Sequence, residues 1–163
     1  MPRNGTKKER PLQPIKNYVL WLLGQREYSA KQLRSRLKLK GYGVAEIEEL
    51  LTLLQTYNYQ SDERFAEVVV RTGSARLGNR GVQAKLMAGG VDEEIASAQL
   101  SQLAPEADRA RALVERFEGK LLDEQLRNKV WRYLTYRGFS SSSIRQAVSH
   151  LEERAKELEQ PDN

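Results

Sequence analysis

Three stretches of the chain are variations of one short unit that recurs about every 50 residues. Each copy has two apolar residues four positions apart, a glycine four positions later, and then a branched apolar residue. The middle copy has one residue fewer between its glycine and its isoleucine. The four positions are Leu33, Leu37, Gly41 and Ile47, then Val82, Leu86, Gly90 and Ile95, then Val130, Leu134, Gly138 and Ile144. This repeat predicts an array of helical units rather than one globular core, and such arrays bind long partners.

Apolar spacing and breaker residues predict three helices in each repeat, with the glycine ending the second helix. No segment alternates with period two, so we expect no sheet. The predicted fold is all-α: three tandem three-helix repeats, helix-turn-helix-like, in an elongated, curved array. The predicted parts are a disordered basic arm (1–14), the repeats at 15–60, 61–104 and 105–158, and a frayed tail (159–163). The predicted helices cover 15–23, 30–40 and 44–57, then one from residue 61 or 62, 82–88 and 92–103, then 106–117, 124–137 and 141–157.

Several side chains carry more specific expectations. Ser29 is a good N-cap for the helix that follows it. Trp21 and Trp131 lie inside apolar runs, so we expect core packing rather than base stacking, whereas Tyr136 beside Arg137 leaves both interpretations open. Residues 140–143 are four serines, more than one helix cap needs, and the sequence offers no reason for the excess.

Composition excludes several classes of function. The chain has no cysteine, which removes disulfides, thiol nucleophiles and cysteine metal sites. The only histidine, His150, has no histidine or cysteine partner, so we expect no metal site. Phosphate-loop, HExxH and GxSxG motifs are absent, and we predict neither an enzyme nor a cofactor. No apolar run can span a bilayer and the basic start has no apolar core, so we expect no membrane association and a cytoplasmic location.

Basic charge recurs with the repeat. The net charge is +5, and in each copy lysine and arginine gather around the second helix, without an acid. Such stripes attract polyanions, because these cations displace the counterions condensed on a phosphate backbone. A solvated helix face explains most single charge runs, but recurrence in three copies favours binding. The candidate basic surface consists of Lys31, Arg34, Lys38, Arg76, Arg80, Lys85, Lys129, Arg132, Arg137 and Arg145.

Four segments together resemble the RecX family, bacterial regulators of the RecA recombinase. They are REYSAKQLRSRLKLKG (26–41), SDERFAEVVVR (61–71), RLGNRGVQAKLMAGGV (76–91) and YRGFSSSSIRQAV (136–148). With the spacing between them, the resemblance covers roughly residues 15–150. One departure is the middle joint, where the family often has a tyrosine–glycine pair and this chain has Leu77-Gly-Asn-Arg-Gly81.

The resemblance implies three tandem three-helix repeats and binding in the groove of the RecA–DNA filament; we also expect a monomer. It implies restraint of filament growth, ATP hydrolysis and strand exchange in recombination and the SOS response, with weak affinity for single- or double-stranded DNA. The alternative is a stand-alone helix-turn-helix-type nucleic-acid-binding protein. Against this alternative, the third helices of repeats one and two begin with acidic residues, which repel phosphate.

Overall fold

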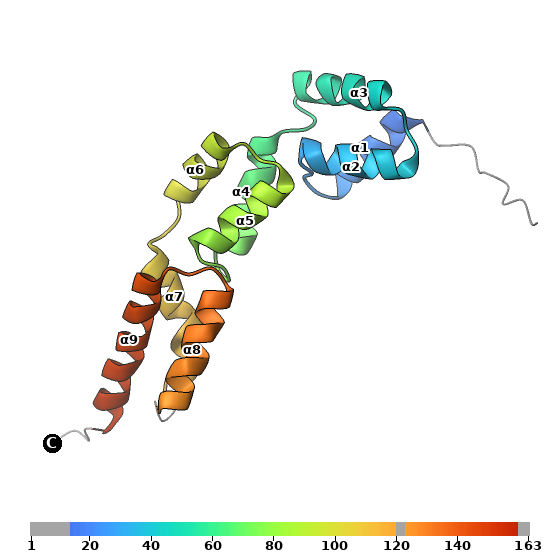
Figure 1. Ribbon diagram of the computed structural model, residues 1–163. Helices are drawn as coiled ribbons and strands as arrows, with labels where there is room; N and C mark the ends of the chain where they lie inside the picture. Colours follow the sequence, from blue (N-terminus) through green and yellow to red (C-terminus); the bar gives the residue numbers. More distant parts are fainter. Residues whose placement is uncertain (1–13, 120–122, 160–163) are drawn as a thin grey trace, which may run out of the picture. The chain divides into compact units, whose positions relative to one another are not determined.

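The computed structural model describes residues 14–119 and 123–159, and there the chain consists of helices joined by turns and short connectors (Figure 1). This confirms the predicted all-α fold of three-helix repeats. The predicted arm and tail lie outside the described residues, apart from Pro14 and Glu159 at their inner ends.

The first repeat comprises α1 (Ile15–Gln25), α2 (Ala30–Lys40) and α3 (Val44–Thr56). Its core comes from the apolar stripes that the sequence predicts, and Ser29 caps α2 by accepting a hydrogen bond from the backbone N–H of Gln32. The buried residues of this core are Val19, Leu22, Tyr28, Leu33, Leu37, Tyr42, Ile47, Leu50, Leu51 and Leu54.

The second repeat comprises α4 (Asp62–Gly73), α5 (Asn79–Gly89) and α6 (Glu93–Ser101). Helix α5 begins three residues before the predicted start at Val82, so part of the expected joint is helical. In α4 the buried residues are Phe65, Ala66 and Val70; Val68 and Val69 are half-buried, and Val69 packs against the core. The buried core is Phe65, Ala66, Val70, Val82, Leu86, Val91 and Ala96.

The third repeat comprises α7 (Glu106–Val114), a 3-10 turn (Glu115–Phe117), α8 (Glu124–Tyr136) and α9 (Ser141–Glu159). The 3-10 turn replaces the last part of the predicted helix 106–117. Helix α9 packs against both α7 and α8 (Figure 1). The buried core is Ala110, Val114, Phe117, Val130, Leu134, Phe139, Ile144, Ala147 and Leu151.

The repeat glycines are the positions where each second helix stops. Gly41, Gly90 and Gly138 have φ angles of 98°, 77° and 79°, all in the left-handed region. At Gly41 and Gly90 the backbone N–H bonds back to the last turn of the helix, as expected for a glycine C-cap. The spacing in the sequence therefore marks a left-handed backbone conformation, which glycine adopts more readily than residues with a Cβ atom.

Both tryptophans contradict the prediction that they pack in the core. The Trp21 residue is 58% exposed and Trp131 is 37% exposed. On α1 the buried positions are Val19 and Leu22, so the apolar stripe of the helix passes beside Trp21, whose ring stacks on Tyr18. A long apolar run hides which of its residues face inward, because packing neighbours decide this.

The described chain divides into two compact units at residue 61. The first repeat is one unit; the second and third repeats form the other, joined through backbone contacts. The N–H of Gly78 donates to the carbonyl of Arg137 (3.0 Å), and that of Arg80 donates to the carbonyl of Gly138 (3.2 Å). A Cβ atom at Gly78, Gly81 or Gly138 would overlap backbone atoms of the facing repeat. We call these three residues the glycine joint.

Two side chains one turn apart on α7 bracket the glycine joint. Arg109 donates to the carbonyls of Ser74 (3.0 Å) and Leu77 (2.7 Å), and to the side chain of Asn79. The carboxylate of Glu106 accepts hydrogen bonds from both sides: the donors are the backbone N–H groups of Asn79 and Ser140 and the hydroxyls of Ser140 and Ser143. Two of the four serines in the 140–143 run therefore bind Glu106.

Candidate functional site

In the first repeat, two of the three predicted stripe residues on α2 are exposed, Lys31 and Lys38. The third, Arg34, makes a two-pronged ion pair with Glu48 of α3: Nε lies 2.6 Å from Oε1, and a terminal nitrogen lies 2.8 Å from Oε2. The hydrogen bond from Arg34 holds the pKa of Glu48 below its ordinary value. Because the Glu48 carboxylate pairs with its guanidinium, Arg34 presents less positive charge to a ligand than the two lysines do.

Three further cations outside the predicted set lie on this helix or in the connector before it. The Arg26 and Arg36 guanidinium carbons lie 4.3 Å and 5.5 Å from the centre of the Tyr28 ring. The Lys40 ammonium lies 5.1 Å from the centre of the Tyr18 ring. Stacking on an aromatic ring orients a cation while leaving its charge available. The Arg26–Tyr28 pair lies within the connector after α1. The Arg36–Tyr28 and Lys40–Tyr18 pairs join α2 to that connector and to α1, so helix packing brings them together.

The glycine joint brings together predicted residues that are far apart in sequence. Arg76 and Arg80 are exposed where α5 begins, and the backbone of Arg80 bonds to Gly138, next to Arg137. Lys85 is exposed about one turn further along α5. The backbones of Arg80 and Arg137, which belong to different repeats, therefore lie close together, a juxtaposition absent from the linear sequence.

Helix α8 contributes Lys129 and Arg132, both exposed, and Arg137 at its end. The Arg137 guanidinium carbon lies 3.7 Å from the centre of the Tyr133 ring, and that of Arg116 lies 4.3 Å from the same centre. Arg116, which is outside the predicted set, is thus a second cation over the Tyr133 ring. Two stacked guanidinium groups present N–H donors suited to a phosphate or a carboxylate.

Arg145 is separate from the α8 group. It lies on α9 and lines an open cavity of about 300 Å³ whose lining residues come from α7 and α9, among them Arg111 and His150. The Nε2 atom of His150 lies 3.4 Å from Oε1 of Glu118, so the histidine contacts a residue of its own repeat. Of the ten predicted residues, the structure thus places nine on or beside the second helices or at the glycine joint, and one on a different face.

Comparisons with known proteins identify the repeats. Family models described as the first, second and third three-helix domains of RecX match residues 16–54, 61–100 and 105–148. The chain belongs to the RecX family. The protein named regulatory protein RecX of Chromohalobacter salexigens is 38% identical over 138 residues, which cover 83% of this chain and 91% of that protein. The RecX of Pasteurella multocida is 34% identical over 149 residues, covering 85% and 88%.

Solved RecX structures share the fold. A crystal structure of RecX from Lactobacillus salivarius superposes with a TM-score of 0.71 at 21% identity, covering 85% of this chain and 95% of that one. At this identity the likeness concerns the fold alone. Within the described residues, no helix is both long and apolar enough to cross a bilayer. The same residues contain no group of three or more aspartate, glutamate or histidine side chains placed to hold a metal ion.

Proposed function

We propose that this protein is a cytoplasmic regulator that binds the RecA–DNA filament in its groove and restrains ATP hydrolysis, filament growth and strand exchange. Membership of the RecX family over all three repeats is the observation that carries the proposal. Exposed cations at the second helices of every repeat support it, since a filament groove offers phosphate along its whole length. Modest contacts from three linked repeats add through effective concentration, so inhibition needs occupancy and no catalysis.

The experiment is an assay of RecA's DNA-dependent ATPase and strand exchange with equimolar protein. We expect both activities to fall. Unchanged rates of both would refute the proposal.

The second function, a stand-alone helix-turn-helix DNA reader, has less support from the site. A reading helix inserts its N-terminal residues into the major groove. Here α3 and α6 carry Glu46, Glu93 and Glu94 in their first turns, and the start of α9 is covered by the Glu106 carboxylate. Carboxylates at these helix starts repel DNA phosphate. Tight, sequence-specific binding to bare duplex in a gel shift would favour this second function instead.

Charge reversal tests the basic surface of the first repeat. We expect the double variant Lys31→Glu/Lys38→Glu to bind RecA filaments about ten-fold or more weakly, and its affinity to depend less on salt, because each lost phosphate contact lowers the salt slope by about 0.7–0.9. The matched control is Arg71→Glu/Lys156→Glu, which makes the same charge change at exposed cations outside the candidate surface. Filament titrations at several salt concentrations measure both. Equal weakening in the two double variants would mean that only net charge matters.

A further inference from the structure

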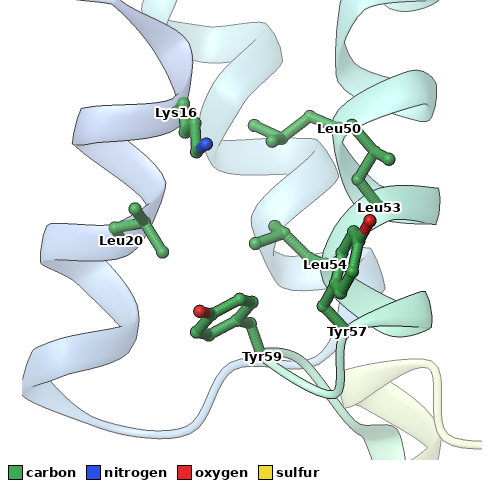
Figure 2. Close-up of a pocket in the computed structure, with 7 residues that line it drawn as sticks. All are labelled: Lys16, Leu20, Leu50, Leu53, Leu54, Tyr57 and Tyr59. Atoms are coloured by element: carbon green, nitrogen blue, oxygen red, sulfur yellow. The ribbon is translucent and has the colours of Figure 1, made fainter.

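The first repeat has an apolar groove on a different set of residues from its basic stripe. Lys16 and Leu20 of α1 form one side, and residues of α3 form the other, with Tyr59 at one end (Figure 2). The groove has a volume of about 280 Å³, just below the roughly 300 Å³ at which ligand clefts begin and enough for a few apolar side chains. The lining of this α1–α3 groove is Lys16, Leu20, Leu50, Leu53, Leu54, Tyr57 and Tyr59.

The groove gathers apolar surface that the repeat leaves in water. Leu50 and Leu54 are buried and belong to the core, so they form a fixed floor. Above them, Leu53 is 48% exposed, Tyr57 69% and Tyr59 60%. With Leu20, these are four of the eleven large apolar residues exposed in the described chain. Single exposed apolar residues are ordinary, but a contiguous concave group of them marks an interaction site.

The tyrosine end of the groove is held in place before any partner arrives. Asn58, between the two tyrosines, has a φ of 57°, a left-handed conformation that turns the chain back. The N–H groups of Tyr59 and Gln60 both donate to the carbonyl of Leu54, at 2.7 Å and 3.2 Å. Gln60 is 1% exposed, and its side chain donates to the carbonyl of Tyr28 and accepts from Gln55. A surface with its backbone already ordered loses less entropy on binding.

The lining favours a protein segment over a nucleic acid. Four of the seven lining residues are leucines and one is a cation, whereas base stacking in single-strand binders combines flat aromatic platforms with a positively charged track. The groove has one cation, Lys16, which lies beside the apolar lining in Figure 2. An ammonium at the edge of an apolar groove complements a carboxylate, and the tyrosine hydroxyls can bond to a peptide or carboxylate.

We propose that the α1–α3 groove docks a segment of the RecA protein itself, an amphipathic segment that inserts apolar side chains and places a carboxylate at Lys16. The inference rests on the proposed function and divides the first repeat into two contacts. The lysines of α2 bind phosphate, and the groove binds protein. Docking of an amphipathic segment into such a groove is a common mode of peptide recognition.

The test is the affinity of variants for RecA filaments formed on single-stranded DNA with a non-hydrolysable ATP analogue. We expect Leu53→Glu to weaken binding about ten-fold or more, because it places a charge in the centre of an apolar contact. The matched control is Leu158→Glu, at an apolar residue of α9 that is 64% exposed and far from the groove in sequence. Both positions are exposed, so both variants should fold, which circular dichroism verifies. Lys16→Glu should also weaken binding, since it would face the carboxylate.

Each other outcome has a distinct meaning. Wild-type protein that fails to bind filaments overturns the proposed function, and the groove inference with it. If the wild-type protein binds filaments and Leu53→Glu binds them with the same affinity, the groove inference alone is overturned. If Lys16→Glu binds filaments more tightly than wild type, the inferred carboxylate of the partner segment is overturned. If Leu53→Glu loses as much affinity for single-stranded DNA without RecA as it loses for filaments, the groove is a base-stacking surface. A wild-type dimer that Leu53→Glu converts to monomer, with filament binding intact, would make it a self-association surface.

Discussion

Replacing Gly78 with alanine should destabilise the unit formed by the second and third repeats by about 3 kcal/mol or more. A Cβ there would overlap the carbonyl oxygen of Gly138 and the backbone of Phe139. Backbone atoms cannot rotate away as a side-chain tip can, so the two repeats must separate and lose the hydrogen bond from Gly78 to Arg137. Thermal unfolding followed by circular dichroism measures the loss of stability.

The control for this variant is Gly24→Ala. Gly24 lies in α1, and a Cβ there meets no atom within 4 Å. Because alanine favours a helix over glycine by about 0.5–1 kcal/mol, this variant should be neutral or slightly more stable. Equal melting temperatures for Gly78→Ala and wild type would show that the glycine joint opens readily. If Gly78→Ala instead folds with the two repeats separated, its helix content should be unchanged. Its filament binding should then be weaker, since Arg80 and Arg137 would no longer lie close together.

Replacing Glu106 with alanine should destabilise the same unit by about 2–4 kcal/mol, because its carboxylate accepts hydrogen bonds from both repeats. Removing it leaves the N–H groups of Asn79 and Ser140 and two serine hydroxyls without this acceptor. Glu106→Gln, which keeps the size and one acceptor oxygen, should lose less. Chemical denaturation measures both, with Glu67→Gln on the exposed face of α4 as the control. A loss for Glu106→Ala no larger than for the control would refute a structural role of the carboxylate.

The pH dependence supplies a second readout for Glu106. Burial alone would raise the pKa of this carboxyl, but the hydrogen bonds from Ser140, Asn79 and Ser143 outweigh it and hold the pKa below the ordinary 4.5. Because the folded pKa is the lower one, the stabilisation is complete above about pH 4.5 and is lost as the pH falls through the folded value. The stability difference between wild type and Glu106→Gln should therefore shrink on acidification below pH 4.5, and a constant difference would contradict this assignment.

Local rules in the sequence predicted most of the fold. Apolar residues at helical spacing located the core of each repeat, and the three repeat glycines marked helix ends because each needs a positive φ. Ser29 was recognisable as a cap from its type and position. These features depend on neighbours within a few residues, so a single sequence contains the information. The error at Trp21 occurred because the apolar run of residues 18–23 offers several possible faces. At Trp131 the buried face of the helix passes through Val130 and Leu134 instead.

The candidate site was predictable as a kind of surface but not as an arrangement. Charge sorting indicated the exposed lysines of α2 and the cations of α8. It could not show that Arg34 is held by Glu48, or that Arg116 stacks on the same tyrosine as Arg137. Arg34 and Glu48 are 14 residues apart, and Arg116 and Tyr133 are 17 apart. Side-chain contacts at such separations follow from helix packing rather than from periodicity.

By itself, the sequence determined the repeat, the helices, the recurrence of basic charge and the family to which the chain is related. The tertiary structure decided how the repeats differ: the second and third are joined at Gly78, Gly81 and Gly138, and the first carries the α1–α3 groove. The physical reason is range. Helix formation and capping act between residues within a turn or two of each other, whereas a joint without side chains and a groove between two helices exist only when distant segments pack together.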